Sequence, residues 1–410
     1  MARLRSRTSN YESALGIPAF RRLFIAQSIS VTGDAAYSTV LAWYVFDSSG
    51  SSQAVSFVLG TVALTRLLSL LSGGALADRF DRRWLMVISD GSRAAFLAVL
   101  SVLIVDGYES LIILVVVTGL TGLVDGLFTP AINGSIPDYV PERCLTSANG
   151  LMGFTRATCF IFGAAIGGVL YAALGAGFVF GLNSLSFLCS AVLLASLPRI
   201  RLGGVAGVHG QVRTFRSIWL GLKYVGTVPV LLSIPIAAFA ILVADAPTSV
   251  LLPAVVKLHF GGGPETIGGL SAALGVGAAV GSLVISRLGG GPRPAIIIFG
   301  SWALAHLLAA ILVAQDSIAV AIVLSAVRGA LSGAGGALWS DMLMRNVDRR
   351  MLSRVFSIDS FGVSAFMPVG VALTGLFASN SISVPFVVIG QVMAFVIMAL
   401  LLAKKSIRDA

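Results

Sequence analysis

Long apolar runs alternate with short polar breaks along the whole chain. Most of the runs contain 18 or more mainly apolar residues, and a helix of that length can cross a hydrocarbon core about 30 Å thick. We therefore predict an all-α membrane protein with twelve transmembrane helices and no room for a soluble domain. The predicted spans are residues 22–46, 54–77, 84–105, 109–130, 148–172, 177–197, 229–253, 266–288, 293–314, 317–338, 353–378 and 383–403.

The longest polar break, residues 198–228, divides these spans into two groups of six. It begins Gly-rich and basic, and its residues 215–224 are typical of an amphipathic helix lying on a membrane surface. The predicted organisation is an N-terminal six-helix half at 1–197, a cytoplasmic linker at 198–228 and a C-terminal six-helix half at 229–410.

A self-comparison of the sequence supports this division. The segment "VPERCLTSANG" at 140–150 aligns without gaps with "VDRRMLSRVFS" at 347–357, an offset of 207 residues. The same offset matches Gly163 with Gly370 and Gly168 with Gly375. Two halves that share a helical layout predict a binding cavity between them, near the bilayer midplane.

Composition and charge agree with a membrane protein. Of the 410 residues, 57% are hydrophobic and 11% are charged, whereas ordinary soluble domains carry about 25% charged residues. The net charge of +10 does not indicate nucleic-acid binding, because the positive charges lie in short loops. With the N-terminus inside, every loop lysine and arginine except Lys257 faces the cytoplasm. We therefore predict an inner (cytoplasmic) membrane protein with both termini cytoplasmic and no cleaved signal peptide.

Residues that could catalyse a reaction or bind a cofactor are scattered. Cys144, Cys159 and Cys189 have no metal-ligand spacing, and the three histidines form no zinc pattern. No Gly-rich loop ends in Lys-Ser or Lys-Thr, as a nucleotide site would, and no nucleophile is accompanied by a base. We predict no enzyme, no metal and no cofactor.

The stretch "GALADRFDRR", residues 74–83, places five charged residues between two apolar runs. It resembles the loop between the second and third helices of the major facilitator superfamily, with Asp81 where that family usually has a glycine. The residues that match the family pattern are Gly74, Leu76, Asp78, Arg79, Arg82 and Arg83. The resemblance covers the chain as a whole and implies a two-by-six helical fold.

The resemblance also implies that this loop is a gate. The carboxylate of Asp78 would face the N-terminal end of the eleventh helix, which carries partial positive charge, and latch the cytoplasmic side in the outward-open state. Arg82 and Arg83 would pair with Asp138 or Asp341. The alternative is a basic loop that only sets orientation, although this leaves Asp78 without a purpose.

Further features are similar to one branch of that superfamily. Gly33-Asp34 in the first span, Asp90 and Arg93 after the gate loop, and "PERCLTSANG" before the fifth span resemble drug exporters, including macrolide efflux and siderophore export proteins. The segment "GAAIGG" at 163–168 is similar to an antiporter signature, with alanine in place of its proline.

Five of the ionisable residues inside the predicted spans are considered for a function. Asp34, Asp125, Asp245 and Arg328 occupy the first, fourth, seventh and tenth spans, which the family resemblance assigns to the cavity lining, and Arg66 occupies the second. A charge at span depth costs at least about 2.5 kcal/mol on insertion scales, so each needs a partner, a water-filled cavity or a function.

These five residues are the candidates for proton coupling. We expect Asp34 to pair with Arg66 or Arg328, because an arginine that moves between states would change the proton affinity of the carboxylate. The alternative is a static buried pair that fixes helix packing. For Asp125, that alternative partner is Arg156.

The predicted partners are a small-molecule substrate, protons and the lipid bilayer, and we expect a monomer. Candidate substrate contacts are Gln27, Tyr37, Trp43, Phe128, Asn133, Trp339, Met342 and Phe361. Large apolar walls with few charges suit amphipathic molecules. The leading hypothesis is export of hydrophobic or amphipathic compounds, such as drugs or natural products, driven by inward proton movement. The alternatives are a facilitator or importer of a polar nutrient and, with least support, a membrane enzyme or structural partner.

Overall fold

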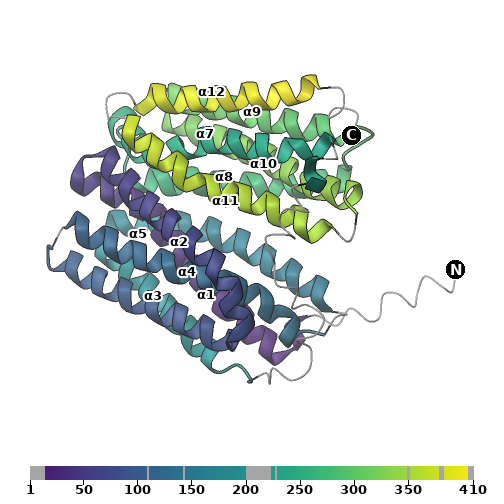
Figure 1. The fold of residues 1–410 in the computed structure, drawn as a ribbon. Coiled ribbons are helices and arrows are strands. Elements are labelled where there is room, and N and C mark those ends of the chain that lie inside the picture. Colours follow the sequence, from purple (N-terminus) through teal and green to yellow (C-terminus); the bar gives the residue numbers. More distant parts are fainter. Residues whose placement is uncertain are drawn as a thin grey trace.

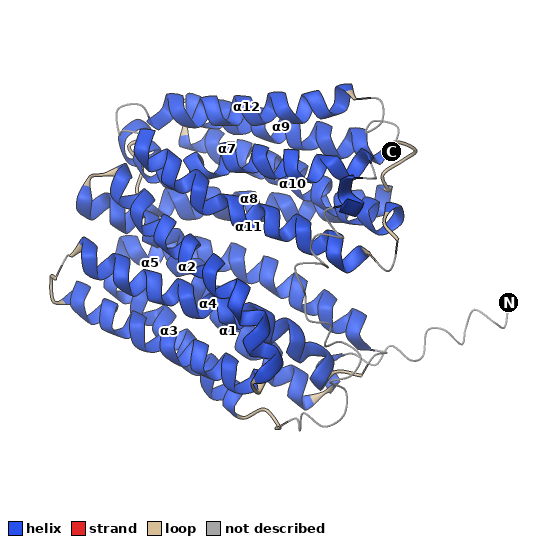
Figure 2. Cartoon of the chain, viewed as in Figure 1, coloured by secondary structure: helices blue, strands red, loops and turns tan. Residues whose placement is uncertain are grey.

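The computed structural model describes residues 14–108, 110–141, 144–199, 223–226, 229–348, 351–377 and 383–404. Within these ranges every regular element is a helix (Figures 1 and 2). The long helices are α1 (Pro18–Ser49), α2 (Ser52–Arg79), α3 (Arg82–Val105), α4 (Leu111–Tyr139), α5 (Leu145–Ala195), α7 (Ser233–Ala254), α8 (Pro264–Leu288), α9 (Pro294–Ala314), α10 (Ile318–Asn346), α11 (Leu352–Phe377) and α12 (Ser383–Ala403). The short segments are η1 (Ala14–Gly16), η3 (Pro229–Leu232) and η4 (Val255–His259).

The predicted all-α membrane fold is confirmed. Every predicted span overlaps one of these helices, and the fifth and sixth both fall on α5, which Gly175 breaks with a φ of 79° that glycine tolerates. Nine described segments are long and apolar enough to cross a membrane. Helix α1 is not among them, because its polar residues lower its mean hydropathy. In α11 the described residues Ala365–Phe377 form a shorter apolar segment. The number of twelve crossings stays a prediction.

Serine and aspartate side chains mark the starts of four helices. Ser51, Ser110 and Ser317 each accept a hydrogen bond from the backbone N–H three residues further on, in α2, α4 and α10. Asp81 starts α3 in a similar way and accepts the N–H of Arg83 at 2.9 Å. The aspartate at the usual glycine position therefore acts as a helix cap.

The helices form two bundles, which lie one above the other in Figure 1. Helices α1–α5 pack together in the first bundle and α7–α12 in the second. Glycines allow the closest approaches: a Cβ on Gly126 of α4 would lie 2.5 Å from the Arg66 carbonyl oxygen of α2, and one on Gly333 of α10 would lie 2.1 Å from the Ala278 carbonyl oxygen of α8. Small residues thus set the helix contacts, as expected where lipid removes the usual hydrophobic drive. The predicted linker falls mostly outside the described residues, so the boundaries of the halves stay a prediction.

Equivalent contacts recur in the two bundles at the 207-residue offset. A Cβ on Gly163 of α5 would lie 2.7 Å from the Ala35 side chain on α1, and one on Gly370 of α11 would lie 2.3 Å from the Leu242 side chain on α7. Adding 207 to the residue numbers of the first contact, 163 and 35, gives those of the second contact, 370 and 242. The repeat in the sequence is therefore matched by a repeat in packing.

The contacts between the bundles follow the same offset. A Cβ on Gly168 of α5 would lie 2.6 Å from the Pro264 carbonyl oxygen of α8, and one on Gly375 of α11 would lie 2.2 Å from Ser56 Oγ of α2. Position 56 shifted by 207 is 263, beside Pro264. The α5–α8 and α2–α11 contacts therefore form a pair with pseudo-twofold symmetry.

The apolar cores show that the bundles meet at one end of the molecule. At the end away from the chain termini, one cluster combines residues of both bundles, among them Val55 of α2 and Val371 of α11. At the other end each bundle has its own cluster, with Ile136 in the first and Leu343 in the second. We call these the closed end and the open end.

Polar contacts also join the bundles at the closed end. Ser56 Oγ of α2 donates to the carbonyl oxygen of Val371 on α11 at 2.5 Å. Lys257 of η4 forms an ion pair with Asp47 of α1, and Tyr171 of α5 donates to the same carboxylate at 3.2 Å. Among the described residues, the closed end thus combines an apolar core with one ion pair between the bundles.

Candidate functional site

The predicted gate residues 74–83 lie at the open end, where α2 ends and α3 begins. Arg82 donates to the Gly134 carbonyl oxygen at 2.9 Å and to Asp138 at 2.8 Å, both on α4. The expected Arg82–Asp138 pair is therefore present. Arg83 donates instead to the carbonyl oxygen of Ala195, at the end of α5.

The acidic partner that was considered for Arg83 is engaged elsewhere. Asp341 pairs with Arg345 on its own helix at 2.9 Å, so a pairing of Arg83 with Asp341 is not formed in this conformation. The side chains of Asp78 and Arg79 lie outside the described part of the structure. The expected latch contact of Asp78 belongs to a conformation in which the bundles meet at the open end, whereas in this structure they have separate cores there. The gate role of residues 74–83 therefore stays a prediction.

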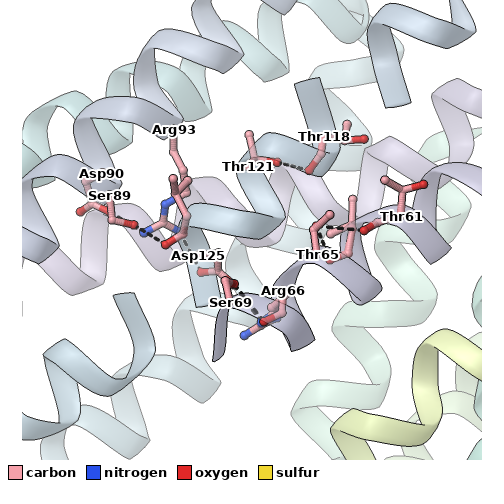
Figure 3. Close-up of polar contacts among 12 residues, drawn as sticks. Thr61, Thr65, Arg66, Ser69, Ser89, Asp90, Arg93, Thr118, Thr121 and Asp125 are labelled. Carbon is pink, nitrogen blue, oxygen red and sulfur yellow. Dashed lines mark hydrogen bonds and ion pairs between the residues drawn. The ribbon is translucent and has the colours of Figure 1, made fainter. Parts of the chain in front are cut away.

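Four charged residues from three helices meet inside the first bundle and form what we call the charge network (Figure 3). Arg93 of α3 forms ion pairs with Asp90, one turn away, and with Asp125 of α4 at 3.1 Å. Arg66 of α2 binds the other oxygen of Asp125 at 2.8 Å. Asp125 is thus shared by two arginines. Asp90 and Arg93, predicted with the gate loop, lie in this interior network.

The inner part of the charge network is almost completely buried. The side chain of Asp90 is 0% exposed and that of Arg93 is 6% exposed. The Arg93 guanidinium carbon lies 4.9 Å from the ring centre of Phe128 and 4.1 Å from that of Phe187, distances typical of cation–π contacts. Ser190 donates to Asp90 at 2.6 Å. Ion pairs, a hydroxyl donor and two rings together offset the cost of removing these charges from water.

Small residues on α2 and α4 bring Arg66 and Asp125 together. Ser69 lies against Gly126, where an added Cβ would be only 1.9 Å from Ser69 Oγ. One turn further, a Cβ on Gly122 would lie 2.6 Å from Thr65 Oγ1. Because the backbones of α2 and α4 approach this closely, the neighbouring side chains of Arg66 and Asp125 can form an ion pair between the two helices.

Asp34 differs from the other membrane acids because it has no ion pair or hydrogen bond among the described residues. Its side chain is exposed on α1 and experiences the charges of Asp125, Arg93 and Arg66. The expected pairing of Asp34 with Arg66 or Arg328 is not formed. Both arginines are occupied by another carboxylate, Arg66 by Asp125 and Arg328 by Asp245.

The second bundle holds a single ion pair at a comparable position. Arg328 of α10 binds Asp245 of α7 at 3.3 Å. Subtracting 207 places these residues at Thr121 of α4 and Ser38 of α1, one helical turn from Asp125 and Asp34. The two bundles therefore carry different charged groups on equivalent helices. The alternative pair of Asp125 with Arg156 is not formed here, where Arg66 and Arg93 hold Asp125.

Most of the predicted substrate contacts are buried in this structure. Exposed fractions are between 1% and 7% for Gln27, Tyr37, Trp43, Phe128, Trp339 and Met342. The aromatic rings pack on one another, as Trp339 does on Phe299 and Trp302, and Phe128 covers Arg93. Asn133 is exposed on α4, and the Phe361 side chain lies outside the described part. Substrate contact by the buried residues has no support in this conformation.

Residues 9–410 match the family described as transmembrane secretion effector. The chain belongs to this family of major facilitator transporters. Over 271 residues it is 30% identical to YfiS of Bacillus subtilis, described as an uncharacterised MFS-type transporter; the match covers 65% of this chain and 63% of YfiS. It is 23% identical to the enterobactin exporter EntS of Escherichia coli, over 93% of this chain and 92% of EntS.

Solved transporter structures share the fold of this family member. The nucleoside transporter NupG superposes with a TM-score of 0.70 and 12% identity, over 93% of this chain and 99% of NupG. A bacterial homologue of the iron transporter ferroportin, in an inward-facing state, gives a TM-score of 0.66 and 17% identity, over 93% and 98%. At these identities the likeness concerns the fold alone.

Besides the ion pairs of the membrane charges, the sequence analysis missed three further contacts. The cap by Asp81 could have been predicted, because aspartate before a helix is a common start signal. The Asp47–Lys257 link also had a signal, since both are isolated charges on the same predicted side of the membrane. The hydrogen bond from Ser190 to Asp90 had no signal in the sequence, because serines are frequent in these helices. The described residues contain no group of three or more metal-ligating side chains.

Proposed function

We propose that this transporter exports hydrophobic or amphipathic small molecules by alternating access, coupled to inward proton movement. The observation that carries the proposal is the unpaired, exposed Asp34 beside a fully paired charge network. In this proposal the protein is a monomer of the bacterial inner membrane and both termini are cytoplasmic. It uses neither a metal nor an organic cofactor, and catalyses no covalent chemistry.

The charge balance around Asp34 favours proton binding. Asp34, Asp90 and Asp125 contribute three negative charges when ionised, and Arg66 and Arg93 contribute two positive charges. One negative charge is therefore in excess at span depth, where it is costly. Protonation of Asp34 removes the excess and leaves the Asp125–arginine pairs intact. In this proposal Asp34 exchanges its proton with water, which its exposed side chain supports.

The arrangement of the bundles supports alternating access. They share an apolar core at the closed end and have separate cores at the open end. With cytoplasmic termini, this conformation opens to the cytoplasm, where an exporter collects its substrate. The similarity to the enterobactin exporter over 93% of the chain supports the export direction.

The test replaces Asp34 by asparagine in protein reconstituted into liposomes. We expect Asp34→Asn to lose substrate accumulation driven by a pH gradient, because the amide has a similar shape but cannot carry a proton, and to retain exchange of substrate down its own gradient. The matched control is Asp316→Asn, which changes an aspartate that is 91% exposed in the α9–α10 loop. Gradient-driven accumulation by Asp34→Asn, sensitive to a protonophore, would contradict the proposal.

The alternative is a facilitator or importer of a polar nutrient, in which the exposed Asp34 binds substrate. A host strain that lacks its own drug pumps separates the two functions. Export predicts that the chain lowers the drug sensitivity of the strain and that Asp34→Asn does not. Import predicts unchanged drug sensitivity with and without the chain.

A further inference from the structure

A buried histidine in the second bundle belongs to a hydrogen-bond chain that links three helices. His306 of α9 is 8% exposed, and its Nδ1 lies 2.7 Å from Oε1 of Gln391 on α12. The Gln391 amide nitrogen lies 2.9 Å from Thr248 Oγ1 and 3.2 Å from the Ala244 carbonyl oxygen, both on α7. The chain ends on the turn of α7 that carries Asp245.

The direction of each hydrogen bond determines where the histidine carries its proton. The Ala244 carbonyl can only accept, and Thr248 donates its own hydroxyl proton to that carbonyl at 2.7 Å. Gln391 must therefore present its NH₂ group to α7 and its oxygen to His306. An amide oxygen cannot donate, so Nδ1 of His306 carries hydrogen in either protonation state. The neutral ring then has its lone pair on Nε2, which has no hydrogen-bond partner among the described residues.

The charged groups around His306 are those of the membrane ion pair. Asp245 of α7 and Arg328 of α10 act on it electrostatically, whereas α12 contributes the neutral Gln391. Asp245 and Arg328 are 3.3 Å apart. Asp245 lies two residues before Pro247, which has no N–H to bond the Val243 carbonyl, so the α7 ladder is already interrupted at this turn.

We propose that His306 is a proton-binding group of the second bundle, which takes up a proton at Nε2 and thereby weakens the Asp245–Arg328 pair. The step forms one N–H bond with a proton from water and breaks no other covalent bond. The resulting imidazolium competes with Arg328 for Asp245, so the link between α7 and α10 loosens where α7 lacks a backbone hydrogen bond. The proposal rests on the proposed proton-coupled function and adds a second proton site, independent of Asp34.

The first test uses the proton as the probe and needs no substrate. Full-length protein with ¹⁵N-labelled histidines is titrated in detergent micelles and followed by NMR, with the other two histidine signals assigned by His209→Asn and His259→Asn variants. We expect a neutral ring with hydrogen on Nδ1 at high pH and an imidazolium at low pH. A neutral ring with hydrogen on Nε2, or a ring that never becomes charged down to the pH of unfolding, would overturn the proposal.

The second test separates proton binding from the structural hydrogen bond. His306→Asn places an amide nitrogen close to the position of Nδ1, so it can still donate to Gln391 but cannot take up a proton, whereas His306→Leu loses both functions. Spin labels on Ile88→Cys of α3 and Met344→Cys of α10, in an Asp34→Asn chain without native cysteines, report the distance between the bundles at the open end. In the parent chain we expect the distance between the labels to change with pH. In the His306→Asn variant we expect no such change and the same thermal stability as in the parent.

The outcomes of the second test are distinct. A shift that persists in His306→Asn, or a parent chain without any shift, would overturn the role of His306. The matched control, His259→Asn, changes a histidine of η4 at the closed end and should keep the shift. Because neither measurement requires a substrate gradient, failure of the His306 proposal can be told apart from failure of proton-coupled export.

Discussion

At the scale of single residues, the site depends on how many partners each charge has. Arg93 has two carboxylates and two aromatic rings around its guanidinium group, whereas Asp34 has no direct partner among the described residues. The first arrangement holds a charge permanently. The second leaves a group free to change charge, which is what a carrier of protons requires.

This difference predicts the effect of breaking the charge network. Arg93→Gln should destabilise the protein by about 3–5 kcal/mol, because it leaves Asp90 buried without a cation. Thermal unfolding in detergent measures the loss. The double variant Asp90→Asn with Arg93→Gln removes both charges and should recover much of the stability. A double variant no more stable than Arg93→Gln would show that the pair is not the source of the effect.

Only part of the site could be predicted from single residues. The sequence identified Asp34, Arg66, Asp125, Asp245 and Arg328 as membrane charges, because each interrupts an apolar run. It did not predict the pairs correctly. Which arginine reaches which aspartate depends on helix rotation and on the distance between helix axes, and neither follows from position along the chain.

At the scale of helices, glycines rather than large apolar residues determine the contacts. Gly333 of α10 lies against the α8 backbone, where an added Cβ would be 2.1 Å from the Ala278 carbonyl oxygen. Gly336, three residues later on the same helix, has open space at its Cβ position within 4 Å. The two glycines therefore form a matched pair for testing close packing.

Gly333→Ala should force α8 and α10 apart and lower the stability of the second bundle. Gly336→Ala should raise stability by up to about 1 kcal/mol, because alanine has the higher helix propensity. The midpoint of thermal unfolding in detergent is the measurement. Similar midpoints for the two variants would mean that α8 and α10 can separate without cost.

The helices themselves could be predicted because membrane thickness imposes a length on each apolar run. Every predicted span overlaps a helix, and the departures have physical causes. Helix α5 joins two predicted spans because Gly175 turns the chain within a single residue. Helix α1 is less apolar than a typical span, and its polar residues include Asp34, on which the proposed function depends.

At the scale of the whole molecule, the described residues that hold the two bundles together at the closed end form an apolar core, the Ser56–Val371 hydrogen bond and the Asp47–Lys257 ion pair. The core is shared by both bundles and the α5–α8 and α2–α11 contacts are related by the 207-residue offset. The Asp47–Lys257 ion pair has no such counterpart, because the residue 207 positions after Asp47 is Ala254, which carries no charge. The charged link is therefore an addition to the symmetric contacts, which a substitution can remove without disturbing the repeat.

Lys257→Gln should shift the equilibrium towards opening at the closed end. The side chains of Lys257 and Asp47 are 41% and 40% exposed, so the pair contributes about 0.2–1 kcal/mol. The population open at this end should rise by about 1.5- to 5-fold, and high salt should produce the same shift in the unmodified chain. Spin labels on Tyr108→Cys and Asp316→Cys, one in each bundle at the closed end, measure the populations.

Tyr171→Phe is the matched control, because it removes a hydrogen bond to Asp47 within the first bundle and leaves the ion pair between the bundles intact. An equal shift in Tyr171→Phe, or no response of the unmodified chain to salt, would show that the ion pair does not hold the bundles together.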